Sequence, residues 1–436
     1  MTDETIYALS SGAGRSAIAI IRMSGCGVRA ALVAMTGIVP RARYARLCHI
    51  HHPATRRVLD HALVLFFPGP HSETGEDVAE FQVHGGRAVV SSVLNALGTI
   101  PGLRPAAPGE FAQRALRNGK MDLLAVEALA DLIDAETELQ RRQAIEGGGL
   151  ILRERADHWR ETLLDILADL EAQIDFSDEG DVTDHIDSQS ERLISNLNSE
   201  MQAVIARGAR GERLREGFRV ALLGLPNAGK SSLLNALAAR DVAIVSAQPG
   251  TTRDRIEVSL DLGGVPIILT DTAGLQDTTD SVEQEGIRRS IDAASSADLV
   301  VWLCATDQPS VPPVMLGEQN LKIVQTKIDL PEHQPNPDAW VAISVASGIG
   351  IGELMHLIEM EARSHFGDEP ALVTRGRHIH TLQIASTCLA RIDGSMPIEL
   401  VAEDIRMACR SLEQLLGRID VEDVLGAIFS RFCIGK

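Results

Sequence analysis

The sequence is short of aromatic residues, long hydrophobic runs and positive charge. Only 3% of its 436 residues are aromatic, whereas 45% are hydrophobic, enough to fill real cores. No run of about eighteen apolar residues occurs, so we expect no membrane-spanning helix. The formal net charge of −19 argues against broad, nonspecific nucleic-acid binding, which depends on neutralising phosphates. It does not exclude a local basic face, for which the candidates are Arg41, Arg43, Arg46, Arg56 and Arg57.

Cysteines are also few, and no metal-binding spacing links them. The six are Cys26, Cys48, Cys304, Cys388, Cys409 and Cys433. This scatter indicates reduced thiols rather than a disulfide framework or a zinc site. The opening MTDETIYALSSG lacks the basic and apolar layout of a signal peptide. We therefore predict a cytoplasmic protein, and its length predicts roughly two or three domains.

The stretch Gly224 to Ser232, GLPNAGKSS, has the spacing of a phosphate-binding loop. A strand-like segment, FRVALL, precedes it, and SLLNALAAR follows with a helical period. Glycines let backbone N–H groups crowd around phosphates, and a helix N-terminus adds partial positive charge. Lys230 would reach the β- and γ-phosphates, while the Ser231 hydroxyl would hold Mg²⁺. The stretch predicts a nucleotide site.

Later motifs complete a GTPase pattern. VSAQPGTTRD lies where a first switch loop belongs, and Thr252 is our choice for the hydroxyl that joins the Mg²⁺ shell. A predicted hairpin, IEVSLDLGGVPIILT, then delivers DTAG. Asp271 would meet Mg²⁺ through water, and the N–H of Gly274 would sense the γ-phosphate. Strands and helices alternate here, which predicts a doubly wound, mostly parallel sheet.

Base selection is assigned to TKID. Asp329 would accept from the ring N–H and the exocyclic amine of guanine, a pair that adenine lacks. Lys327 would lie along the purine. Thr326 replaces the usual Asn, so one amide contact is missing and we expect weak affinity. The full predicted nucleotide site is Asn227, Ala228, Gly229, Lys230, Ser231, Ser232, Ser246, Ala247, Gln248, Pro249, Gly250, Thr251, Thr252, Asp271, Thr272, Ala273, Gly274, Thr326, Lys327, Asp329 and Ser344.

The catalytic group is less evident from the motifs. Ras-like enzymes place a water-orienting Gln after DTAG, and this chain has Leu275 there. Hydrolysis must therefore use another group. Gln276 is adjacent, and Arg253 is a candidate arginine finger.

The remaining segments predict two further kinds of domain. The pattern of residues 1–118 predicts an α+β domain. Residues 119–213 and 367–436 have helical patterns, and glycines at Gly147 and after it predict a break in the first helical part. We expect the two helical parts to pack together around an inserted GTPase domain, residues 214–366. His378 and His380 have a poor metal spacing, so we expect both at the surface.

A cluster of acidic residues with one histidine lies in the first segment. It comprises Glu73, Glu76, Asp77, Glu80 and His84. Such a cluster is compatible with metal binding or acid–base chemistry, and its spacing specifies neither.

Several strings resemble the MnmE family, also called TrmE, of bacterial and organellar tRNA-modification GTPases. These are DETIYAL, IIRMSG, FPGPHSETGEDVAEFQVHGG, PGEFAQRALRNGKMDL, GLPNAGKSS, GTTRD, DTAGL and the final FCIGK, so the resemblance runs from end to end. One departure is SSGAGRSA, which stands where the family prefers a Pro-Gly-Arg-Gly-Gly type of loop.

The resemblance implies an N-terminal domain that dimerises and binds a tetrahydrofolate derivative. By motif, the matching folate contacts are Arg22, Glu80 and Lys120. For the C-terminal tail, the resemblance implies that Lys436 is a further folate contact and that Cys433 takes part in the modification chemistry. The alternative for Cys433 is a buried thiol with no chemical role.

For hydrolysis, the resemblance implies that Glu283 positions the attacking water. It also implies a K⁺ ion in place of an arginine finger, bound when two GTPase domains pair. A cation there would add the positive charge that a missing Arg would have supplied. The matching K⁺ ligands are Asn227, Ser246, Gln248 and Thr251. The Mg²⁺ ligands are assigned as Ser231 and Thr252.

The function implied is a homodimeric, K⁺-stimulated GTPase. With an FAD-dependent partner, MnmG, it would modify C5 of wobble uridine 34 in certain tRNAs, using a tetrahydrofolate one-carbon unit and ammonium or glycine. Two alternatives stay open. One is a ribosome-assembly GTPase of the Era or Der type, although no GXXG loop with basic flanks is evident. The other is a GTP-dependent scaffold with a degenerate folate domain.

Overall fold

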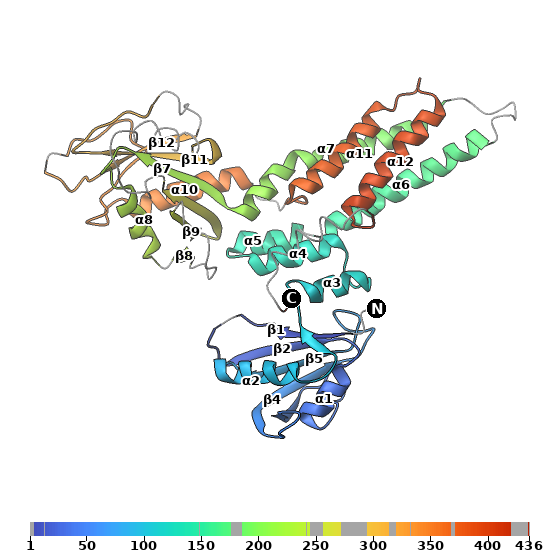
Figure 1. Ribbon diagram of the computed structural model, residues 1–436. Coiled ribbons are helices and arrows are strands. Elements are labelled where there is room, and N and C mark those ends of the chain that lie inside the picture. The colour runs from blue at the N-terminus through green and yellow to red at the C-terminus, as the bar shows by residue number, and fades with distance from the viewer. Residues whose placement is uncertain are drawn as a thin grey trace, which may run out of the picture. The chain divides into compact units, whose positions relative to one another are not determined.

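The computed structural model divides the chain into two compact units, residues 1–130 with 410–436 and residues 131–409. Its described residues are 4–12, 14–147, 149–175, 185–240, 242–244, 256–271, 294–313, 320–331, 333–367, 371–419 and 435. Figure 1 labels the elements. Among the described helices, none is both long and apolar enough to cross a membrane.

The first unit is built on a six-stranded mixed sheet with the order β3-β4-β5-β2-β1-β6. Its strands are β1 (Thr5–Leu9), β2 (Ile18–Ser24), β3 (Arg46–His51), β4 (Val58–Phe67), β5 (Val78–His84) and β6 (Leu103–Pro105). Helices α1 (Val28–Thr36) and α2 (Arg87–Gly98) bury one apolar face of this sheet. Phe111 of α3 (Glu110–Arg117) packs on β1 from a separate small cluster.

The second unit contains a seven-stranded sheet with the order β13-β12-β11-β7-β10-β9-β8. Its strands are β7 (Phe218–Gly224), β8 (Ala243–Ile244), β9 (Ile256–Leu262), β10 (Val265–Asp271), β11 (Leu299–Ala305), β12 (Leu321–Thr326) and β13 (Val341–Ala342). The pairs of β7 with β10 and β11, and of β12 with β11 and β13, are parallel. The predicted hairpin forms as the antiparallel pair β9–β10. This segment therefore forms the mostly parallel α/β sheet that its sequence predicts.

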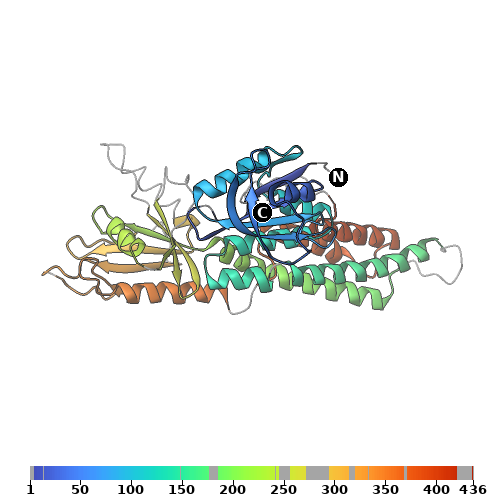
Figure 2. The same cartoon turned by 90° about the horizontal axis from the view of Figure 1, so that it is seen from below.

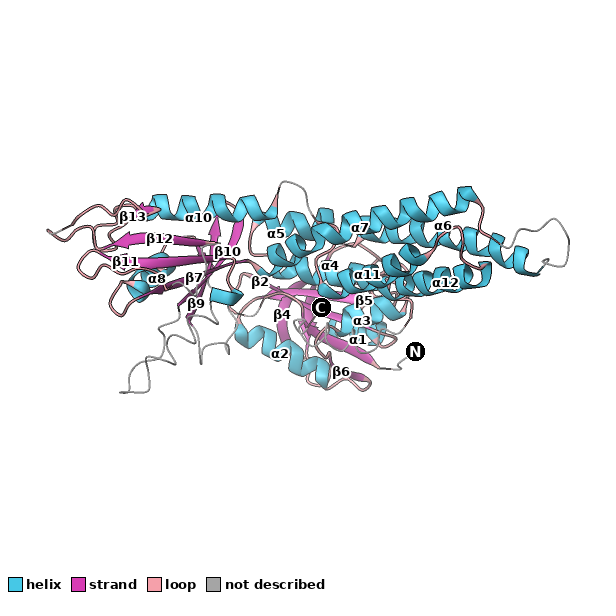
Figure 3. Ribbon diagram, turned by 90° about the horizontal axis from the view of Figure 1, so that it is seen from above, coloured by secondary structure: helices cyan, strands magenta, loops and turns pink. Residues whose placement is uncertain are grey.

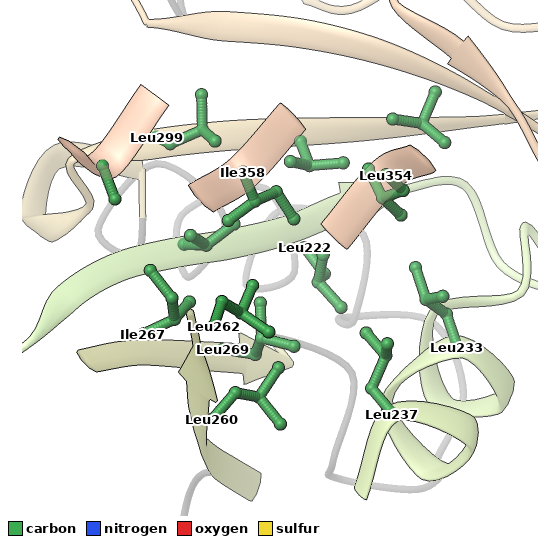
Figure 4. Close-up of a cluster of buried hydrophobic side chains, with 14 of the residues drawn as sticks. Leu222, Leu233, Leu237, Leu260, Leu262, Ile267, Leu269, Leu299, Leu354 and Ile358 are labelled. Atoms are coloured by element: carbon green, nitrogen blue, oxygen red, sulfur yellow. The ribbon is translucent and has the colours of Figure 1, made fainter. Parts of the chain in front are cut away.

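Helices α8 (Lys230–Ala238) and α10 (Ile351–Phe366) pack into one cluster on the same face of that sheet. Figure 3 distinguishes these helices from the strands by colour. The core between them is aliphatic: Leu222 of β7 lies with Leu233 of α8 and Leu354 of α10 (Figure 4). A smaller cluster on Leu223 and Trp302 lies on the opposite face of their strands. Because both faces of the sheet are covered, β11 is buried at every position and β7 at most of its positions.

Long helices form the rest of the second unit. They are α6 (Leu150–Asp175), α7 (Ser188–Glu216), α11 (Gly376–Arg391) and most of α12 (Ile398–Leu415). Figure 2 shows α6 and α7 side by side, and Trp159 Nε1 donates to Glu200 Oε2 across them at 2.8 Å. The predicted break appears as a π-helix, Gln143–Gly147, that follows α5 (Glu138–Arg142).

The returning chain packs on the helices before the GTPase segment, as the sequence predicts. On α7, a Cβ at Gly208 would lie 2.8 Å from Ile379, and one at Gly211 would meet the Val373 carbonyl at 2.2 Å. These close approaches require glycine. The surface placement predicted for His378 is wrong, because its side chain is 3% exposed. It lies on the buried stripe of α11 with Leu382 and Ala385, whereas His380 is exposed.

The tip of the β9–β10 hairpin joins the sheet to these helices. The Leu139 N–H of α5 donates to Gly264 O at 3.1 Å. From α10, Arg363 donates to Gly263 O and pairs with Glu359 at 2.9 Å. The opposite end of β10 carries Asp271, so one strand connects the nucleotide motif with the helical layer.

Candidate functional site

The phosphate-loop motif lies between β7 and α8, as its spacing predicts. Gly224 has φ +149°, and a Cβ there would meet Leu303 O at 2.6 Å, so a side chain would push the loop off β11. Gly229 has φ +98° and caps the N-terminus of α8. First-turn N–H groups of that helix therefore remain available to an anion.

Lys230 lies folded into this loop. Its Nζ donates to Gly224 O and Leu225 O, each at 2.9 Å. Burial lowers the pKa of Lys230, and the nearby Asp271 carboxylate acts in the opposite direction. The residue is 8% exposed. The Lys230 ammonium group, now bound by two carbonyl oxygens, can exchange these acceptors for phosphate oxygens without a change in its charge.

Ser231 and Asp271 come together from different elements. Asp271 ends β10, which pairs with β7 so that Asp271 lies opposite Leu222. The Ser231 hydroxyl donates to Asp271 Oδ2 at 3.0 Å, and Asp271 is 1% exposed. A hydroxyl and a carboxylate beside a phosphate loop are the oxygen donors that Mg²⁺ favours in such sites.

The base-selecting motif follows β12, whose carboxyl end lies on the same edge of the sheet. Thr326 donates its hydroxyl to Ala228 O of the phosphate loop at 2.7 Å, and both residues are buried. From the sequence, Thr326 indicates only a lost amide contact. No local signal shows which carbonyl its hydroxyl meets, so this bond was not predicted.

The neighbours of Thr326 complete this edge. Lys327 has φ +61°, and its ammonium group pairs with Asp307 at 2.7 Å. Asp329 is exposed, whereas Ser344 is fully buried, and its hydroxyl accepts from the Ser347 N–H at 3.1 Å. Parallel strands thus bring three separated motifs to one edge, where such sheets bind ligands.

Several predicted residues lie outside the described part of the chain. Those with nucleotide or K⁺ roles are Ser246, Ala247, Gln248, Pro249, Gly250, Thr251, Thr252, Thr272, Ala273 and Gly274. Glu283 also lies outside the described residues, as do Arg253 and Gln276, the other candidates for the catalytic group. The tail residues Cys433 and Lys436 lie outside them too.

In the first unit, the structure brings Arg22 and Glu80 together. They lie opposite each other on β2 and β5, and Arg22 pairs with Glu80 at 2.9 Å and with Glu73 at 2.6 Å. Lys120 lies against the same loop, because a Cβ on Gly75 would be 3.3 Å from its Cε. The loop carrying Glu73 and Gly75 thus pairs with Arg22 and lies against Lys120, two of the predicted folate residues.

Arginines pair with most carboxylates of the acidic cluster. Besides the pairs of Arg22, Asp77 pairs with Arg29 at 2.6 Å, and His84 Nδ1 is hydrogen-bonded to Asp60 Oδ1 at 2.8 Å. Across the described residues, no group of three or more His, Cys, Asp or Glu side chains is arranged to hold a metal ion. Ion pairing accounts for these residues in the first unit.

A buried network beneath this loop was not found from sequence. Arg114 is 4% exposed and pairs with Glu76 at 2.9 Å and Glu110 at 3.2 Å. Burial raises the pKa of Glu110, but hydrogen bonds from Arg104, the Ala107 N–H and Arg114 outweigh it and hold the pKa at about 2. Asn118 adds a bond to Thr74 O at 2.7 Å. Together these contacts fix the loop that borders Arg22.

The chain's tail reaches this unit through Gly435. Ser10 donates its hydroxyl to Gly435 O at 2.8 Å. Gly435 has φ +105°, and a Cβ on it would lie 2.1 Å from Leu9 O. Because Leu9 pairs with Ile21, next to Arg22, the tail lies by the strands that carry the predicted folate contact.

Two family models match almost the whole chain. The model described as the GTP-binding protein TrmE N-terminus matches residues 5–120, and the MnmE helical domain model matches residues 123–433. Three curated relatives carry the name "tRNA modification GTPase MnmE". The one from Beijerinckia indica is 48% identical, covering 100% of this chain and 96% of the relative. That from Methylorubrum populi is 47% identical, with 100% and 98% covered, and that from Azorhizobium caulinodans is 48% identical, with 100% and 99% covered.

Proposed function

This chain belongs to the MnmE family of tRNA modification GTPases, and we propose that it binds and hydrolyses GTP to modify tRNA. Its target would be C5 of wobble uridine 34, with a tetrahydrofolate one-carbon donor, an FAD-dependent partner (MnmG) and a cytoplasmic homodimer. The observation that carries the GTPase assignment is the shared edge of β7, β10 and β12, where Lys230, Asp271 and Thr326 converge. Sequence similarity to MnmE relatives over the whole chain favours this function over a role in ribosome assembly.

The residues of this edge fit GTP and Mg²⁺. Lys230 and the N-terminus of α8 would bind the phosphates, and Ser231 with Asp271 would hold the metal ion. Mg²⁺ supplies charge neutralisation on the phosphate oxygens when bound. Thr326 ties the base-binding loop to the phosphate loop, and Asp329 would select guanine. These residues bind and orient the nucleotide, and Glu283 is our candidate for positioning the attacking water.

We propose that a K⁺ ion supplies the positive charge that an arginine finger would have supplied. Asn227 of the phosphate loop has φ +64°, an unusual backbone conformation for a residue other than glycine. Its amide oxygen is a suitable ligand, and Ser246, Gln248 and Thr251 are assigned as the remaining ones. An oxygen-lined site beside phosphates suits a monovalent cation that would stabilise negative charge during transfer.

The GTPase assignment is tested by steady-state hydrolysis in KCl and in NaCl of equal ionic strength. We expect faster turnover in KCl, an Asn227→Ala variant that loses this preference, and a Lys230→Ala variant with almost no activity. Asn235→Ala, an exposed asparagine of α8 outside the predicted nucleotide site, is the matched control. Equal rates in the two salts would refute the role assigned to K⁺. Full activity of Lys230→Ala would refute the assignment of the nucleotide site.

The folate assignment rests on the Arg22–Glu80 pair, the adjacent loop and the tail at Ser10. Arg and Lys would meet carboxylate or carbonyl oxygens of the folate, and Glu80 would accept from pterin N–H groups. We expect the intact chain to bind 5-formyltetrahydrofolate, and a chain ending at Arg431 to bind it more weakly. No binding by either, with GTP hydrolysis intact, would favour the scaffold function.

A further inference from the structure

Positive charge is unevenly distributed along this acidic chain. Between Thr5 and Leu59 the sequence holds eight arginines and no aspartate or glutamate, although the chain carries 60 acidic residues and a net charge of −19. A long acid-free segment in such a chain indicates a surface with its own electrostatic role.

Five of these arginines gather around one edge strand. Arg41 and Arg43 precede β3, Arg46 begins it, and Arg56 with Arg57 lies in the turn between β3 and β4. All five are exposed, and β3 is the outermost strand of its sheet. We call these five residues and Tyr44 the basic edge.

The arginines of the basic edge have no acidic partners in the described part of the chain. Arg43 donates to His71 O, Arg56 donates to Ala34 O at 3.0 Å, and Arg41 lies over the Tyr44 ring at 4.1 Å. By contrast, Arg22 and Arg29 of the same segment each pair with carboxylates. The basic edge therefore presents uncompensated positive charge.

The edge has the length and residue types of an RNA-backbone contact. Strand β3 runs for six residues from Arg46 toward the turn that holds Arg56 and Arg57, which corresponds to about 20 Å of extended chain. That length can face several successive phosphates. Guanidinium groups bind phosphate oxygens through two parallel hydrogen bonds, and the 55% exposed Tyr44 offers a ring for stacking.

We propose that the basic edge binds the phosphate backbone of tRNA. This inference rests on the proposed function, which supplies the RNA substrate, and it adds the surface that receives it. Contacts of this kind position the RNA and carry no base sequence information, so binding depends steeply on salt. The folate residues of the same unit lie on β2, β5 and their loops, apart from the edge strand in sheet order.

The test uses the full chain and bulk tRNA, with fluorescence anisotropy titrations between 50 and 200 mM KCl. The double variant Arg46→Gln/Arg57→Gln removes one cation from each end, and neither side chain makes a described hydrogen bond. Losing about two phosphate contacts should reduce the salt slope by about 1.4 to 1.8 and weaken binding roughly 30-fold at 0.1 M salt. Arg192→Gln/Arg210→Gln, two exposed arginines of α7, is the control with the same charge change.

The control pair should leave the salt slope unchanged. Equal weakening by both pairs would overturn the proposal, because it would show an effect of total charge only. Absence of tRNA binding by the unaltered chain would overturn it too. So would loss of binding to vesicles of anionic phospholipid with tRNA binding intact, which would make the edge a membrane contact. GTP hydrolysis without tRNA, and thermal unfolding, report separately on the nucleotide site and on folding.

Discussion

Thr326 offers a sharp test of how the two halves of the nucleotide site are joined. Its hydroxyl donates to Ala228 O at 2.7 Å, and the two residues are 1% and 2% exposed. Thr326→Val keeps the shape and removes the donor. The Ala228 carbonyl would then be buried without that partner, which costs about 1–3 kcal/mol.

Part of this cost should appear without ligand. A loss of about 1 kcal/mol lowers the melting temperature of a domain of this size by about 2–4 °C. The rest should appear as weaker nucleotide binding, because the phosphate loop and the base loop are no longer held in register. Since 1.4 kcal/mol is tenfold in affinity, we expect the Kd for GDP to rise about 5-fold, and at most about 30-fold.

The assay is titration with a fluorescent GDP analogue beside thermal unfolding without nucleotide. Thr326→Ser is the matched control, because it keeps the hydroxyl and loses one methyl group, worth about 0.8 kcal/mol. We expect Ser to bind GDP nearly as the native chain does and Val to bind it clearly more weakly. Equal affinities for Val and Ser would refute the role given to this hydroxyl.

Three further outcomes follow from the first unit. Replacing Arg114 by Leu should lower the free energy of unfolding by about 3–5 kcal/mol in denaturant titrations, because Glu76 and Glu110 keep their charge without it. The pKa of Glu110 falls from 4.5 to about 2 on folding. Its contribution should therefore be complete above pH 4.5 and be lost as the pH falls toward 2, which acid unfolding measures; a Glu110→Gln chain should lose that dependence. Gly435→Ala should weaken 5-formyltetrahydrofolate binding at unchanged GTP hydrolysis, because its Cβ would collide with Leu9 O.

The elements that the sequence predicted well are those with a local signal. The apolar strand before Gly224, the glycines of the loop and the helical period after it lie within one stretch of chain, so their pattern alone predicts strand, turn and helix. The sheet register places Arg22 opposite Glu80, which residue spacing alone does not predict, and their role in folate binding stays a prediction.

What the sequence did not predict depends on partners far along the chain. The hydroxyl of Thr326 meets a carbonyl 98 residues away, and the carboxylate of Glu76 meets Arg114 from another element. His378 has polar character but occupies a buried position of α11, where the helix faces its neighbours. Side-chain type and spacing fix none of these contacts; tertiary packing does.

We propose that this chain is a GTPase that acts in the modification of wobble uridine in tRNA. The most direct measurement is nucleoside analysis of tRNA from cells lacking the chain, complemented by the native form or by Lys230→Ala. We predict loss of the C5-modified uridine, restored by the native chain and not by the variant. Unchanged wobble uridine in cells without the chain would contradict the claim.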